Sequence, residues 1–106
     1  MKLNKQEFKV LVMLYAANID GNIQSEEVKV MLEKTDFDTV DKVEKLFEKM
    51  NDAQVLDCIL ENKAEYAATE ADREEIIQDI ITVIMADDNL VMMEEFLVKA
   101  MRKVLA

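Results

Sequence analysis

Apolar residues recur at helical spacing from one end of the chain to the other. The first stripe follows an i, i+3, i+4, i+7 pattern and comprises Phe8, Leu11, Val12 and Tyr15. Three further apolar residues widen this stripe: Val10, Met13 and Leu14. We expect a helix from about Asn4 to Asn18 that is buried over much of its circumference. Asn4 and Glu7 have the spacing of a capping box, which marks the start of this helix.

A second amphipathic pattern begins after a short polar stretch. Ser25 is a good N-cap, and the two glutamates after it suit the positive end of the helix dipole. This second helix is predicted to run to about Lys34, with Asp36–Thr39 as a connector after it. A third helix is expected from about Val40 to Met50, because apolar residues return there at helical spacing.

Three more helices are predicted in the second half of the chain. Asn51 and Gln54 form another capping-box pattern, which starts a fourth helix. Thr69 begins a fifth, which we expect to be central because it has the strongest apolar stripe in the chain: Ile76, Ile77, Ile80, Ile81, Ile84 and Met85. A sixth helix, from about Met92 to Leu105, closes the domain with basic residues near the negative end of its dipole.

The composition agrees with an all-α fold. Proline is absent and Gly21 is the only glycine, whereas a β-sandwich or barrel needs a turn about every 8–12 residues. A chain of 106 residues, of which 51% are hydrophobic, suits one compact domain over residues 1–106 with a modest core. We therefore expect a single multihelical domain of about six helices.

The charge of the chain limits its partners. A formal net charge of −10 repels nucleic acid and anionic lipid, and it favours cations or basic proteins as ligands. Such acidity also has a simpler explanation, which is solubility. The longest apolar run, Val10–Ala17, is far shorter than the roughly 20 residues that span a membrane. We expect a cytoplasmic protein that does not insert into membranes.

Few residues of the kinds used in catalysis are present. Histidine is absent, which removes the common general base and most zinc or iron sites. Cys58, the only cysteine, lies near an apolar helix face, so we expect a buried and inert thiol. Ser25, the only serine, occupies a helix start. An enzyme is the least favoured class, and no catalytic residue is assigned.

One acidic pattern occurs twice. The stretch 18–27 reads Asn-Ile-Asp-Gly-Asn-Ile-Gln-Ser-Glu-Glu, and a similar stretch follows the fifth predicted helix at residues 87–94. The matching positions keep a constant offset of 67 residues: Asp20 with Asp87, Asn22 with Asn89, Ile23 with Leu90, and Glu27 with Glu94. In each half, a strongly apolar helix enters the acidic turn and an amphipathic helix leaves it. A duplication of this kind would relate the two turns by an approximate two-fold axis.

The repeated turns carry oxygen donors, which suit hard divalent cations such as calcium or magnesium. The candidate metal ligands are Asp20, Glu27, Asp87 and Glu94, with Asn18, Asn22 and Asp88 as additional ligands. An EF-hand alignment fails, because its first and third loop positions would be Val83 and Met85 in the second copy. The alternative is that the pattern only turns the chain. In that case the aspartates accept hydrogen bonds from backbone amides of the loop, and the glutamates stabilise the N-terminal ends of the helices.

The two turns also carry a resemblance to a known family. Residues Ala16–Ile23 with Glu27, and Met85–Leu90 with Glu94, resemble the TerB-like family, which is associated with bacterial tellurite resistance and stress responses. The likeness spans most of the chain. It departs from the family pattern at Asp88, where glycine is usual.

This resemblance implies an all-helical fold of two three-helix repeats with pseudo-two-fold symmetry. It also implies a cation site at the acidic positions and a place in protein assemblies rather than catalysis. A role with tellurium oxyanions would be a family property only, since a surface of charge −10 binds anions poorly. The alternative is a metal-free helical protein–protein interaction module, in which some of the eight methionines, such as Met92 and Met93, line an adaptable surface.

Overall fold

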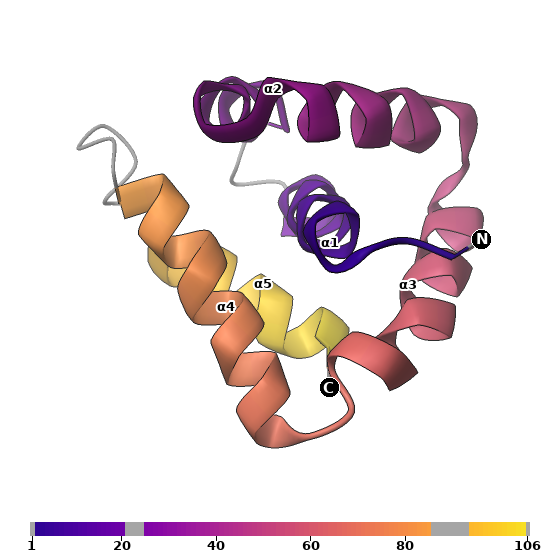
Figure 1. Ribbon diagram of the computed structural model, residues 1–106, viewed down its shortest axis with the longest axis vertical. Helices are drawn as coiled ribbons and strands as arrows, with labels where there is room; N and C mark the ends of the chain where they lie inside the picture. Colours follow the sequence, from indigo (N-terminus) through magenta and orange to yellow (C-terminus); the bar gives the residue numbers. More distant parts are fainter. Residues whose placement is uncertain (1, 21–24, 86–93, 106) are drawn as a thin grey trace.

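The computed structural model describes the backbone of residues 2–20, 25–85 and 94–105, and the side chains of residues 2–18, 37–82, 95 and 98–105. Every regular element in these ranges is an α-helix, as the sequence predicts. The helices are α1 (Lys5–Asp20), α2 (Ser25–Lys49), α3 (Asp52–Tyr66), α4 (Glu70–Met85) and α5 (Glu94–Leu105). Figure 1 shows the other helices arranged around α1.

Helix α1 is the centre of the fold. It packs against each of the other four described helices, and its residues from Phe8 to Ala17 are buried except for Lys9, which is half-buried. The expectation that this helix is buried over much of its circumference is confirmed. The prediction of a central position for the helix after Thr69 is wrong, because α4 keeps an exposed face that includes Glu75 and Gln78. A strong apolar stripe buries one face of a helix, whereas an apolar run on all sides places it inside.

The connector predicted at Asp36–Thr39 is also wrong. These residues lie within α2, which is helical throughout Ser25–Lys49. No proline or glycine interrupts the segment, and Asp and Thr each weaken a helix by well under about 1 kcal/mol. Packing of the second half, where Val40 and Val43 are fully buried on the core, outweighs so small a penalty. Two predicted helices are therefore one, and the described ranges contain five helices rather than six.

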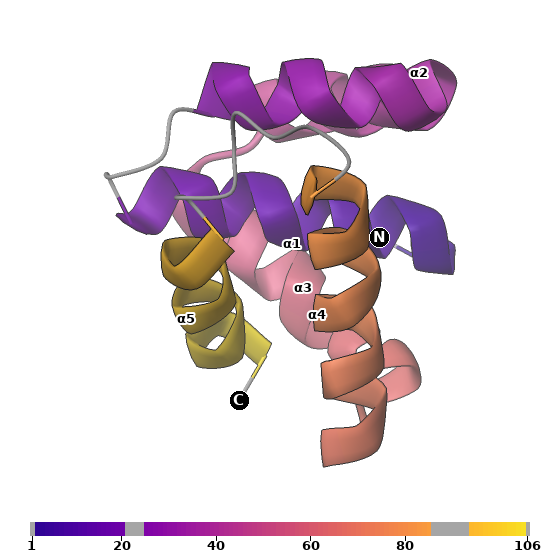
Figure 2. The same ribbon diagram turned by 90° about the vertical axis from the view of Figure 1, so that its left-hand side faces the viewer.

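Although α2 is continuous, it bends. Its first part is seen nearly end-on at the upper left of Figure 1, and its second part runs across the top of the same view. In Figure 2 the first part runs across the view alongside α1. Beyond the bend, the second part of α2 runs toward the start of α3 (Figure 1).

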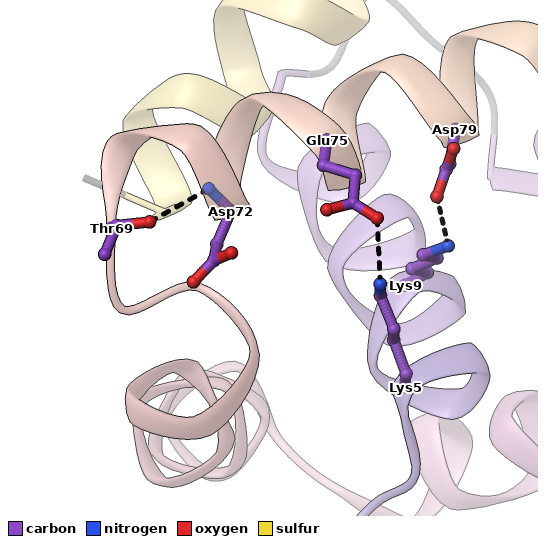
Figure 3. A network of polar contacts seen from close by, with 6 residues as sticks. All are labelled: Lys5, Lys9, Thr69, Asp72, Glu75 and Asp79. Carbon is purple, nitrogen blue, oxygen red and sulfur yellow. Dashed lines mark hydrogen bonds and ion pairs between the residues drawn. The ribbon is translucent and has the colours of Figure 1, made fainter.

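The later helices begin close to the predicted signals. Helix α3 has a full capping box, in which the Asn51 side chain accepts from the Gln54 backbone N–H at 2.8 Å and Gln54 Oε1 accepts from the Asn51 N–H at 2.9 Å. Helix α4 follows Thr69, whose Oγ1 accepts from the Asp72 N–H at 3.1 Å (Figure 3). In the described part of the chain, no helix is both long and apolar enough to cross a membrane.

Candidate functional site

Both acidic stretches fall between successive helices. Helix α1 ends at Asp20 and α2 begins at Ser25, so the first stretch links these two helices. Helix α4 ends at Met85 and α5 begins at Glu94, so the second links the last two. Figure 2 shows the end of α1 and the beginning of α5 on the same, left-hand side of the molecule. We call these two links the acidic corners.

The predicted ligands occupy defined positions in the chain, but most of their side chains lie outside the described residues. Asp20 is the last residue of α1, Glu27 lies in the first turn of α2, and Glu94 is the first residue of α5. Three more predicted ligands belong wholly to the ranges outside the description: Asn22, Asp87 and Asp88. Their grouping around an ion therefore stays a prediction.

Asn18 is the predicted ligand whose side chain is described. It is exposed, and its Nδ2 donates to Asp52 Oδ1 at 3.3 Å. Asp52 opens α3, so the end of α1 near the first acidic corner also contacts the start of a third helix. Sequence analysis missed this neighbour, since 34 residues separate the two side chains and no local pattern links them.

The helices that enter the acidic corners differ from the others in charge. Neither α1 nor α4 has a basic residue in its last turn. The other three helices each do: Lys49 in α2, Lys63 in α3, and Arg102 with Lys103 in α5. A helix C-terminus carries a partial negative charge that a nearby cation stabilises. Among the described helices, only α1 and α4, which end at the acidic corners, lack a lysine or arginine in the last turn.

A dense set of polar contacts lies at the opposite end of α1. Glu7 is 6% exposed and completes the predicted capping box: its Oε1 accepts from the Asn4 N–H at 2.9 Å, and Asn4 Oδ1 accepts from the Glu7 N–H at 2.8 Å. Lys42 from α2 pairs with the same carboxylate, Nζ to Oε2, at 2.6 Å. The Asn4 hydrogen bond and then the Lys42 contact hold the pKa of Glu7 below its usual value.

Helix α3 fixes the segment before α1 through two polar side chains. Asn62, only 3% exposed, accepts from the Leu3 N–H at 2.9 Å and donates to the Cys58 carbonyl at 2.8 Å. Tyr66 donates from its hydroxyl to the Leu3 carbonyl at 2.8 Å, and its ring centroid lies 5.6 Å from that of Phe8. Sequence analysis missed both residues. A buried asparagine on an apolar helix face was the available signal.

Cys58 lies on the same buried face. Burial raises the pKa of its thiol, so the reactive thiolate form is disfavoured. The expectation that Cys58 is buried is confirmed.

Two parallel ion pairs join α1 to α4. Lys5 Nζ lies 3.2 Å from Glu75 Oε1, and Lys9 Nζ lies 2.6 Å from Asp79 Oδ2 (Figure 3). The partners are four residues apart on both helices, so two turns of each helix face each other. Arg102 of α5 forms a two-pronged pair with Glu74 on the same helix α4. The side chains in these pairs are partly exposed, so each pair adds little to stability. Their main effect is to fix the orientation of α4.

The side chains at residues 2–18, 37–82, 95 and 98–105 include no group of three acidic or cysteine residues that could hold a metal ion. Comparisons with known protein families, with curated proteins and with solved structures find no match.

Proposed function

We propose that this chain is a non-enzymatic, TerB-like helical module that binds a divalent cation, calcium or magnesium, at its acidic corners. The two-repeat arrangement belongs to the same proposal: α1 and α2 flank one corner, α4 and α5 flank the other, and α3 connects the halves. The ligands would be the carboxylates of Asp20, Glu27, Asp87 and Glu94. A module of this kind would act within protein assemblies in a stress response.

One observation carries this proposal. The two helices that enter the acidic corners are the two described helices without a basic residue in the last turn. Their negative helix ends and the acidic residues of the corners add to the same local field, and a bound cation would neutralise both. If these stretches served only as turns, a lysine in the last turn of α1 or α4 would stabilise the end of the helix. Basic residues have this position in α2 and α5.

The donor chemistry fits hard cations. Carboxylate and amide oxygens at 2.3–2.6 Å are typical of calcium, and magnesium accepts fewer protein ligands and keeps several waters. Each corner offers two carboxylates from the repeat, which is few for a complete site. Two ions held weakly, or one ion shared between the corners, are the arrangements that this donor count allows.

Calorimetric titration tests the proposal. We expect calcium or magnesium to release or absorb heat on binding to the wild type, and Asp20→Asn with Asp87→Asn to abolish the signal. The matched control is Asp38→Asn with Asp57→Asn, which makes the same change in charge at two exposed aspartates outside the corners. The stoichiometry separates one shared ion from two. Equal heats of cation binding from the corner variant and the control variant would contradict a cation site at the acidic corners.

The second candidate function is a metal-free protein interaction module. The observation in its favour is that two large apolar side chains are exposed among the described residues, Phe37 at 58% and Leu60 at 47%. Such residues mark binding surfaces when they belong to a larger apolar patch. Absence of any cation effect on the wild type would favour this function.

A further inference from the structure

Helix α3 presents two kinds of surface, arranged in rows of residues four apart. The row Cys58–Asn62–Tyr66 and the neighbouring Val55 and Ile59 face the interior, where α1 is the main packing partner of α3. Figure 1 shows α3 at the edge of the molecule, with α1 to one side of it. The remaining rows are turned away from the core, except that Leu56 at their margin is half-buried and packs in part against it.

The first outer row is apolar. It consists of Leu56, which is half-buried, Leu60, which is 47% exposed, and Ala64, which is exposed. Ala53, one turn before Leu56, extends the same strip and is exposed. Residues at i, i+4 and i+8 form a continuous ridge on a helix. We call these four residues the α3 strip.

The second outer row is acidic and lies directly beside the strip. Asp57, Glu61 and Glu65 follow the same four-residue spacing, each one position after a member of the apolar row, and all three are exposed. Successive residues on a helix are about 100° apart, so the two rows run side by side along the helix. The outer surface of α3 thus combines an apolar ridge with a negative edge.

This pairing indicates what kind of partner fits. An amphipathic helix packs its apolar face on an apolar ridge, with anchors at i, i+3 or i+4, and i+7. A neighbouring row of lysine or arginine on that helix would meet Asp57, Glu61 and Glu65. A second copy of this chain fits poorly, because two-fold pairing brings identical acidic edges together and each copy carries a charge of −10.

We propose that the α3 strip, with its acidic edge, docks a basic amphipathic helix of a partner protein. This surface lies on the helix that belongs to neither acidic corner, so the inference goes beyond cation binding and does not depend on it. The strip offers Leu60 as the central anchor, and the acidic row sets the orientation and charge of the partner.

A pair of synthetic peptides tests this inference. Each is a helical peptide of roughly 18 residues with a leucine ridge at i, i+4 and i+7, and it carries lysines beside the ridge in one version and glutamates in the other. Fluorescence anisotropy with the full chain, in a chelator, should show binding of the lysine peptide only. Amide shift mapping by NMR should place the perturbed residues on α3.

Variants separate this surface from general attraction to an acidic protein. Leu60→Ala should weaken binding of the lysine peptide about tenfold. Asp57→Lys with Glu61→Lys should transfer the preference to the glutamate peptide. The control Asp38→Lys with Glu48→Lys makes the same charge change on exposed residues of α2 and should keep the preference for the lysine peptide. Circular dichroism checks that each variant folds.

Three results would overturn the proposal. The first is that the α2 and α3 charge reversals change peptide binding equally, which would mean that the peptide is attracted to the acidic protein as a whole and not to α3. The second is a set of shift perturbations located away from α3. The third is a wild-type dimer in sedimentation that Leu60→Ala converts to a monomer, which would assign the strip to a second copy of this chain. Because the titrations are run without cation, none of these results bears on the acidic corners.

Discussion

Helices α1 and α3 have nearly the same length, 16 and 15 residues, but opposite relations to the rest of the fold. Helix α1 is surrounded by the other four described helices and buries almost every side chain from Phe8 to Ala17. Helix α3 buries Val55, Cys58, Ile59 and Asn62 on one face, half-buries Leu56, Lys63 and Tyr66, and exposes its other residues. The first is the structural centre of the fold, and the second supports one side of it and exposes its outer face to solvent.

The comparison shows where this protein can change without losing its fold. Substitutions along α1 disturb contacts with all its neighbours, because interiors are close-packed. Substitutions on the outer rows of α3 disturb few contacts, so that surface is available for recognition. Asn62 and Tyr66 are the exception, since they connect α3 to the segment that precedes α1.

The largest expected effect comes from the same substitution made in both helices. Leu11 is fully buried in α1, and Leu60 lies on the outer row of α3. Leu11→Ala should lower the free energy of unfolding by about 2–5 kcal/mol through lost burial and a cavity. Leu60→Ala should change it by less than about 1 kcal/mol. Urea unfolding followed by circular dichroism measures both, and equal losses would remove the distinction between the two helices.

The next effect concerns the polar link between α3 and the start of the chain. Asn62→Ala leaves the buried Leu3 N–H without its partner, so we expect a loss of about 1–3 kcal/mol. Asn18→Ala is the same substitution at an exposed site, where it removes a 3.3 Å contact to the Asp52 carboxylate, and it should cost less than about 0.5 kcal/mol. Similar losses for both asparagines in urea unfolding would show that the link to Leu3 contributes little.

Glu7 provides a smaller effect that depends on pH. Its pKa is lowered in the folded state from an ordinary value of 4.5. The folded protein therefore binds a proton at Glu7 more weakly than the unfolded chain does. Its contribution is therefore fully present above pH 4.5 and is lost as the pH falls through the folded pKa. Glu7→Gln keeps an oxygen that can accept from the Asn4 N–H but loses the charge that pairs with Lys42, so it should cost about 1 kcal/mol near neutral pH.

The measurement is the difference in unfolding free energy between wild type and Glu7→Gln across the acid range. This difference should shrink as the pH drops below 4.5. The exposed Asp57, substituted by Asn on the outer row of α3, is the control for the loss of one carboxylate from the surface. A constant difference for Glu7→Gln would mean that ionisation of this carboxyl is not what stabilises the start of α1.

The smallest expected effect lies between α1 and α4. A double-mutant cycle with Lys9→Gln and Asp79→Asn should give a coupling of about 0.5 kcal/mol, because the Asp79 side chain is 48% exposed and water screens the pair. Added salt should reduce the coupling. A coupling above about 2 kcal/mol that resists salt would mean that ion pairs, and not only apolar packing, hold helices to α1.

Local signals account for what could be predicted from the sequence. The capping boxes at Asn4 with Glu7 and at Asn51 with Gln54 join residues three positions apart, and the structure contains both. The position of each acidic stretch between two helices was likewise predicted, since apolar periodicity stops and restarts around it.

Contacts between distant residues account for what could not be predicted. The bonds from Asn62 and Tyr66 to Leu3 span 59 and 63 residues, and no local spacing encodes them. The expected connector at Asp36–Thr39 rested on residues of low helix propensity. Tertiary packing overrides such a weak preference, and α2 continues through them. Whether the corner carboxylates meet depends on the same kind of long-range placement, and the ion remains a proposal.

The most direct test of the central proposal is thermal unfolding in a chelator and then in millimolar calcium or magnesium. A ligand that binds only the folded state at 100 times its Kd adds about 2.7 kcal/mol, which raises the Tm of a domain this small by roughly 10 °C or more. We predict such a rise for the wild type and for Asp38→Asn with Asp57→Asn, and none for Asp20→Asn with Asp87→Asn. An unchanged wild-type Tm, or an equal rise in the corner variant, would contradict cation binding at the acidic corners.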